Sequence, residues 1–181
     1  MPGKLTQQRA QQCLPKSLLL YADPPSPATD PVPTPRTARS VVLDTNVVLD
    51  WQVFRHPDGQ ALAAALNSGE LRWIATAAMR DELAHVLGRG ALDRWAPDLP
   101  GLWADWERHC TDTPTPAAAH PGGRFHCTDP DDQKFIDLAI SAGPCLLLSR
   151  DRAVLKLARR LREVGVDVLT PTAWAARRAT G

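Results

Sequence analysis

Residues 41–50 read VVLDTNVVLD, and the rest of the chain is organised around this stretch. Its first three residues are aliphatic and predict a buried strand that stops at Asp44. Thr45 and Asn46 then supply side-chain oxygens suited to a turn or a helix cap, and an apolar segment follows. Ligands of open α/β sheets bind at the carboxyl ends of the strands. Asp44 is therefore a candidate site residue, provided that other acids converge on it.

The composition is that of an ordinary globular protein. The chain has 181 residues, of which 44% are hydrophobic, and a net charge of +1. This charge argues against a uniformly basic nucleic-acid binder but allows local basic patches. The four cysteines are far apart and form no CxxC pair, so we expect reduced thiols and neither a zinc site nor a disulfide framework. Without a membrane-spanning run or a signal peptide, the protein is expected to be cytoplasmic.

Three segments are distinguished by their composition. Residues 1–39 include a stretch, 24–35, in which nearly every second or third residue is proline, so we expect this extension to be extended or disordered. The extension is basic and could contact RNA or a partner, but we favour a dispensable extension or a wrongly chosen start codon. Residues 40–176 have the pattern of a folded domain, and 177–181 form a basic tail that we expect to fray.

Strands and helices alternate along the folded segment. Strands are predicted at 41–43, 71–75, 124–127, 145–149 and 166–169. Helices are predicted at 59–67, 77–87, 152–163, from about 130, after 170, and as one or two segments within 91–110, with a loop at 111–123. If the strands are parallel, the residues that follow them share one edge of the sheet.

Four carboxylates have no obvious structural role in this pattern. Asp44 and Asp151 each terminate a predicted buried strand, whereas Glu82 and Asp132 each lie on the apolar face of a predicted helix. Together at one sheet edge, they would raise one another's pKa. A hard divalent cation that prefers oxygen ligands, such as Mg²⁺ or Mn²⁺, would relieve this repulsion.

Other interpretations of these acids were weighed. Each acid taken alone could be a helix cap or half of an edge salt bridge, and only the four together favour a metal site. Haloacid-dehalogenase-like phosphatases also place Asp after a first strand, but they need a second Asp two residues on, where this chain has Asn46. The sequence shows no Ser-His-Asp or Cys-His spacing and no phosphate-binding glycine loop.

The chain resembles PIN domains, in particular those assigned as toxins of toxin–antitoxin pairs. The resemblance covers about residues 40–176 and rests on LDTNVVLD at 43–50, RDELAHVL at 80–87, DPDDQKFIDLA at 129–139, LLLSRDRAVL at 146–155 and VDVLTPTAW at 166–174. It implies an α/β fold with three α/β/α layers and a central, mainly parallel sheet. The proline-rich N-terminus departs from the family pattern, and Ser149 stands where threonine is more usual.

The resemblance also implies a site and an activity. It assigns the metal to Asp44, Glu82, Asp132 and Asp151, with Thr45, Asn46 and Ser149 as supporting hydrogen bonders. It implies Mg²⁺- or Mn²⁺-dependent cleavage of RNA, a cognate antitoxin that blocks the site, and a domain that commonly forms homodimers.

We expect metal-assisted phosphodiester hydrolysis that leaves 5′-phosphate and 3′-hydroxyl ends. Four basic residues follow the 145–149 strand and are candidates to bind the RNA backbone, although an ordinary solvated helix face would look the same: Arg150, Arg152, Lys156 and Arg159. Two alternatives remain open. One is a PIN-like RNA-binding or complex-forming module without turnover, and the other is an RNA-processing nuclease outside any toxin–antitoxin pair.

Overall fold

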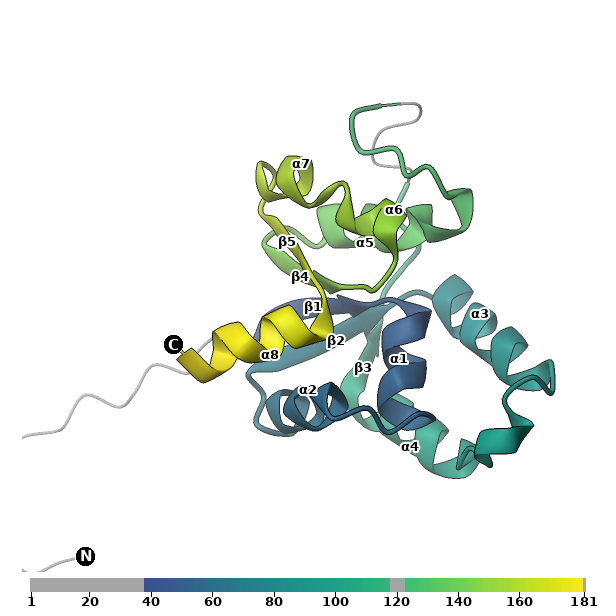
Figure 1. Cartoon of the computed structure of the whole chain (residues 1–181). Helices are drawn as coiled ribbons and strands as arrows, with labels where there is room; N and C mark the ends of the chain where they lie inside the picture. The colour runs from purple at the N-terminus through teal and green to yellow at the C-terminus, as the bar shows by residue number, and fades with distance from the viewer. Residues whose placement is uncertain (1–37, 118–122, 181) are drawn as a thin grey trace, which may run out of the picture. The chain divides into compact units, whose positions relative to one another are not determined.

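The computed structural model describes residues 38–117 and 123–180, and a parallel five-stranded sheet lies at the centre of this part of the chain (Figure 1). The strands run in the order β3-β2-β1-β4-β5, and each neighbouring pair is parallel. Their bounds are β1 Arg39–Leu43, β2 Leu71–Ala75, β3 Cys110–Asp112, β4 Cys145–Leu148 and β5 Val166–Leu169. The predicted parallel α/β fold is confirmed. Of the predicted extension, residues 1–37 lie outside the described part.

Helices cover both faces of this sheet. Figure 1 shows α5, α6 and α7 on one side and α1, α2 and α8 on the other, which gives the expected three layers. The helices are α1 Thr45–Gln52, α2 Asp58–Asn67, α3 Ala77–Gly88, α4 Leu99–His109, α5 Gln133–Ser141, α6 Arg152–Leu155, α7 Ala158–Arg162 and α8 Pro171–Thr180, with 3₁₀ turns η1 Asp93–Trp95 and η2 Pro130–Asp132. None of these helices is long and apolar enough to span a membrane.

The core explains why the central strands read as continuous apolar runs. Val41 and Val42 in β1 and Leu146 and Leu147 in β4 are fully buried, because helices cover the sheet on both faces. Asp44 continues β1 by donating its backbone N–H to the carbonyl of Leu148 at 3.0 Å. The first acid of the predicted site is thus held in register with the end of β4.

Two strand predictions were wrong. Residues 124–127 form no strand, because the backbone N–H of Cys127 donates instead to the side chain of Gln133 at 2.8 Å. Conversely, β3 was predicted as part of a helix and a loop. It is a short edge strand whose residues are half-buried or exposed, so it has no strand-like apolar pattern.

Two helix predictions also differ from the structure. The helix predicted at 152–163 is divided into α6 and α7, because the Leu157 N–H bonds back only three residues, to Val154, in a tighter turn. The expected frayed tail at 177–181 is instead helical as far as Thr180, and Arg178 near this end forms an ion pair with Glu70 at 2.8 Å.

The fully buried position of Leu147 predicts a large loss of stability on truncation. Leu147→Ala should lower the free energy of unfolding by about 3 kcal/mol, since the cavity left between the sheet and the helices that cover it cannot collapse fully. Urea unfolding measures this change. The control Val164→Ala, at a position that is 40% exposed, should cost less than about 0.5 kcal/mol. Equal losses in the two variants would contradict the described core.

Candidate active site

The carboxyl edge of the sheet brings the four predicted acids into one region. Asp44 and Asp151 follow the neighbouring strands β1 and β4. Glu82 comes from α3, which follows β2, and Asp132 ends η2, just before α5. Their charges interact, because Glu82 and Asp151 raise the pKa of Asp44, and Asp44 and Asp151 raise the pKa of Asp132. The convergence expected from the sequence is therefore present.

Asp44 is the most deeply placed of these acids, with 2% of its surface exposed. It caps α1, where its Oδ1 accepts the backbone N–H of Asn46 at 3.2 Å. Its Oδ2 accepts the hydroxyl of Ser149 at 2.6 Å. Burial raises the pKa of the Asp44 carboxyl, and these two hydrogen bonds oppose the rise. The side chain is held in one orientation with both oxygens engaged.

Ser149 links two of the acids. Its buried hydroxyl donates to Asp44 and also accepts the backbone N–H of Asp151 at 2.9 Å. Asp151 in turn caps α6 by accepting the N–H of Ala153 on Oδ1 at 2.5 Å. A single hydroxyl thus sets the spacing between the ends of β1 and β4, and a serine serves this purpose as a threonine would.

Glu82 is oriented by one predicted residue and one that the sequence analysis missed. Thr45 donates its hydroxyl to Glu82 Oε1 at 2.6 Å. The ammonium group of Lys134, on α5, forms an ion pair with Glu82 Oε2 and also donates to the carbonyl of Asp131. The only sequence signal for Lys134 is its place two residues after Asp132, and a lysine near a helix start is too common to single out.

Asp132 has a strongly raised pKa. Its pKa is raised to about 7, first by burial and then by the charges of Asp44, Asp151 and Asp129, whereas Lys134 lowers it. Within the described residues no hydrogen bond or ion pair reaches its carboxylate. Asp132 is thus the acid whose charge is least compensated by the protein itself.

The remaining predicted residues differ in their surroundings. Asn46 is exposed, and only its backbone N–H contacts Asp44. Arg150 forms ion pairs with Asp50 at 2.5 Å and with Asp58 at 3.5 Å. The other three predicted RNA-backbone residues are exposed and form no ion pair in the described part of the chain: Arg152, Lys156 and Arg159.

The donor chemistry of this site fits a hard cation, although the present side-chain positions do not form a closed ligand set. Across 38–117 and 123–180, no three Asp, Glu, His or Cys side chains are grouped so that they could hold one metal ion. The oxygens of Asp44 bond to Ser149 and Asn46, and Lys134 is paired with Glu82. Four carboxylates at one sheet edge, two of which (Asp44 and Asp132) have raised pKa values, are nevertheless the oxygen-rich, anionic environment that Mg²⁺ or Mn²⁺ prefers.

Comparison with known proteins identifies the family of this chain. Residues 40–153 match the family model of the PIN domain, so the chain belongs to the PIN-domain family, whose members are generally nucleases. Among solved structures the chain is similar to the PIN domain of T. brucei RRP44. The two share 11% identity with a TM-score of 0.43, over 80% of this chain and 83% of that chain. No curated protein matches the chain.

The raised pKa of Asp132 predicts how pH affects the metal-free protein. The folded state holds this proton more tightly than the unfolded chain, so the stabilisation is present at low pH and is lost as pH rises towards about 7. Asp132→Asn removes this loss. With EDTA present, the variant should melt about 3 °C higher than wild type at pH 8, which corresponds to about 1 kcal/mol after solvent screening.

At about pH 3.5, below the usual aspartate pKa of 3.8, the melting temperatures of wild type and Asp132→Asn should nearly coincide, because Asp132 is protonated in both the folded and the unfolded state. Asp131→Asn, a change at the exposed neighbouring carboxylate, is the matched control and should leave the pH dependence of wild type unchanged. Parallel pH profiles for wild type and Asp132→Asn would show that Asp132 titrates normally.

Proposed function

We propose that this chain is a divalent-metal-dependent endoribonuclease that hydrolyses RNA phosphodiester bonds. The observation that carries the proposal is the convergence of Asp44, Glu82, Asp132 and Asp151 from four different elements of a PIN domain. The raised pKa values of Asp44 and Asp132 show that their negative charges are costly to the folded protein, and a bound cation would offset this cost.

The four acids would hold Mg²⁺ or Mn²⁺, with Asp44 and Asp151 as the principal ligands. When bound, such an ion supplies a water of lowered pKa and neutralises negative charge that develops on the phosphate. Glu82 and Asp132 would complete the oxygen shell or position the attacking water. Ser149 and Thr45 orient the carboxylates of Asp44 and Glu82 through hydrogen bonds of 2.6 Å each.

RNA would approach along α6 and α7, because α6 begins directly at Asp151. The exposed side chains of Arg152, Lys156 and Arg159 are the candidates to bind backbone phosphates, which the acids alone would repel. Arg150 is the weakest of the predicted backbone contacts, since its guanidinium is already shared by Asp50 and Asp58.

The biological role that we favour is the toxin of a toxin–antitoxin pair acting in the cytoplasm. Support comes from the resemblance of the sequence motifs to such toxins. A cognate antitoxin would block the acidic site, and a homodimer would be the active form. A gene for a small DNA-binding protein directly upstream would favour this role, and its absence would favour an RNA-processing nuclease.

Replacement of Asp44 tests the proposed activity. Wild type should cleave single-stranded RNA in the presence of Mn²⁺ or Mg²⁺ and leave 5′-phosphate ends. Asp44→Asn should lower the rate at least about 100-fold, since a neutral amide binds a hard cation poorly. Gel analysis of end-labelled RNA measures both the rate and the product ends.

The control for this experiment is Asp81→Asn, which removes an exposed carboxylate one residue before Glu82 and should retain the wild-type rate. Equal cleavage by wild type and Asp44→Asn would refute the proposed site. A wild type that binds RNA but never cleaves it would support the non-catalytic module instead.

The ion pair between Lys134 and Glu82 predicts a change in metal affinity. Lys134→Met removes a cation beside the acids and frees Glu82 Oε2, so the Kd for Mn²⁺ should fall about three- to tenfold. Isothermal titration calorimetry measures this Kd. Arg80→Gln removes a cation on α3 that pairs with Glu107 on α4 and should leave the Kd unchanged. Weaker Mn²⁺ binding by Lys134→Met would show that Glu82 is not a ligand.

A further inference from the structure

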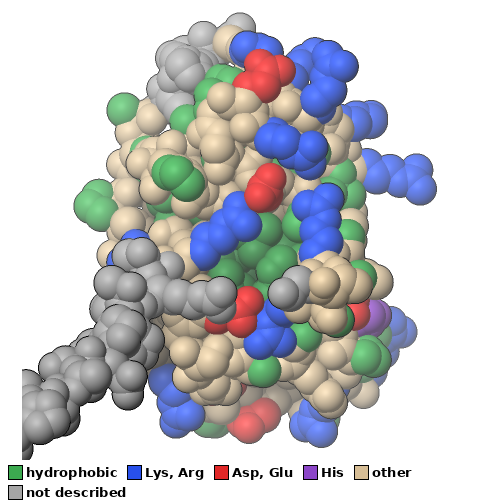
Figure 2. All heavy atoms as spheres, turned by 90° about the vertical axis from the view of Figure 1, so that its left-hand side faces the viewer, with side chains coloured by type: hydrophobic (Ala, Val, Ile, Leu, Met, Phe, Trp, Pro, Cys, Tyr) green, Lys and Arg blue, Asp and Glu red, His purple; other side chains and the backbone are tan. Residues whose placement is uncertain are grey.

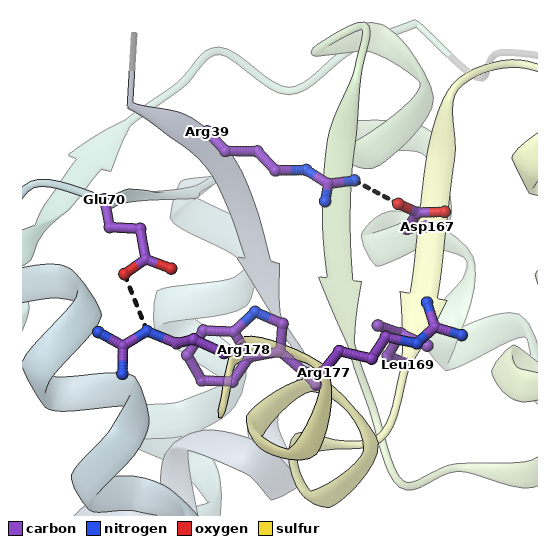
Figure 3. A pocket seen from close by; sticks show the side chains of 7 residues that line it. Arg39, Glu70, Asp167, Leu169, Arg177 and Arg178 are labelled. Carbon is purple, nitrogen blue, oxygen red and sulfur yellow. Dashed lines mark hydrogen bonds and ion pairs between the residues drawn. The ribbon is translucent and has the colours of Figure 1, made fainter. Parts of the chain in front are cut away.

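The amino edge of the sheet carries a pocket that the proposed cleavage site does not use. Its volume is about 620 Å³, within the range of small-molecule sites. Figure 3 shows the side chains that line it, which come from the start of β1, from the segment before β2, from β5 and from α8: Arg39, Glu70, Asp167, Leu169, Trp174, Arg177 and Arg178. Because α8 runs back from the carboxyl edge, its last turn brings two arginines to this end.

Positive charge exceeds negative charge in and beside this pocket. Glu70 pairs with Arg178 at 2.8 Å, and Asp167 pairs with Arg39 at 2.6 Å and with Arg162 at 3.6 Å. The hydrogen bond from Arg39 holds the pKa of Asp167 below its usual value, so this acid stays ionised and engaged. Both acids of the pocket are therefore already neutralised by arginines.

Arg177 is the arginine of the pocket that remains available. Within the described residues its guanidinium forms no hydrogen bond or ion pair, and Figure 3 shows it extended near Leu169. A guanidinium presents a planar fork of N–H donors that matches a phosphate group. Arg177 therefore offers the pocket an unpaired donor set for an anion.

The pocket also has an apolar component. Leu169, which is half-buried, and the small exposed part of Trp174, which is 7% exposed, form an apolar wall of the pocket. Figure 2 shows Lys and Arg side chains gathered around an apolar hollow on this face of the molecule. An anion joined to a flat ring is the chemistry of a nucleotide, whereas an acidic peptide would use only the charges.

The pocket is separate from the acidic site. Arg39 begins β1 and Asp44 follows its end, so these two residues lie about 17 Å apart along the strand, at about 3.3 Å per residue. Leu169, in contrast, ends β5, and its carbonyl accepts the N–H of Ser149 at 3.1 Å. A phosphate held beside Arg39 is consequently too distant to be the bond that is cleaved.

We propose that this pocket binds a phosphate-bearing nucleotide unit, either within an RNA strand away from the cleaved bond or as a free nucleotide. Binding of an RNA strand rests on the proposed ribonuclease function, whereas binding of a free nucleotide does not. Bound in this way, an RNA strand would gain affinity without any change in the chemical step.

The test follows the indole N–H signal of Trp174 in the full-length protein by NMR, with EDTA present to prevent cleavage. The chain has six tryptophans, and the signal is assigned by its loss in Trp174→Phe. We expect it to shift with adenosine 5′-monophosphate, with a short single-stranded RNA, or with both, but not with adenosine. A response to the RNA alone identifies the strand as the source, and a response to the nucleotide alone identifies the free ligand.

Arg177→Gln should weaken binding of the responding probe about three- to tenfold. If the probe is RNA, the dependence of its affinity on salt concentration should also fall by about one phosphate contact. Arg108→Gln is the matched control, an exposed arginine in the last turn of α4 as Arg177 is in α8. Its affinity should equal that of wild type.

Three outcomes would overturn the proposal: no shift of Trp174 with either probe, equal weakening by Arg177→Gln and Arg108→Gln, or a shift with a glutamate-rich peptide alone. Because all measurements are of binding without metal, they are independent of cleavage. A protein that binds the nucleotide here but never cleaves RNA would refute the proposed function and leave the pocket assignment intact.

Discussion

The hydrogen bond between Ser149 and Asp44 is the interaction on which the candidate active site depends. It joins the ends of β1 and β4 with a 2.6 Å contact between two buried side chains. A buried carboxylate without partners would be strongly destabilising, and this hydroxyl together with the N–H of Asn46 offsets much of that cost. Because the same hydroxyl also accepts the N–H of Asp151, it sets the positions of two acids at once.

The negative charges of the acids destabilise the folded protein, because the carboxylates are partly buried and repel one another. The same charges favour binding of a cation. Burial and mutual repulsion raise the pKa of Asp44 and Asp132, so the protein would be more stable with fewer carboxylates. Lys134 compensates part of the charge by pairing with Glu82. A side-chain ammonium thus provides some of the positive charge that a metal ion would supply more fully.

The parallel sheet gives the protein two chemically different ends. Side chains after β1 and β4 form the acidic edge, whereas Arg39 at the start of β1 and the last turn of α8 form the basic pocket. The two ends are joined by the buried strands, so each can carry its own charge with little effect on the other. An RNA strand that contacts both ends would be repelled by the acidic edge when no cation is bound there. A bound cation would remove this repulsion.

The sequence by itself determined the parallel α/β fold, most strands and helices, and the convergence of four acids, because apolar strand runs ending in Asp are local patterns. It did not reveal β3, whose residues lack an apolar pattern, or the turn at 124–127, where a glutamine side chain replaces strand pairing. Only the tertiary structure decided that Lys134 pairs with Glu82, that Arg150 is held by Asp50, and that α8 brings Arg177 to the amino edge. These contacts join residues distant in sequence, and whether a charge is paired or free depends on which elements pack together.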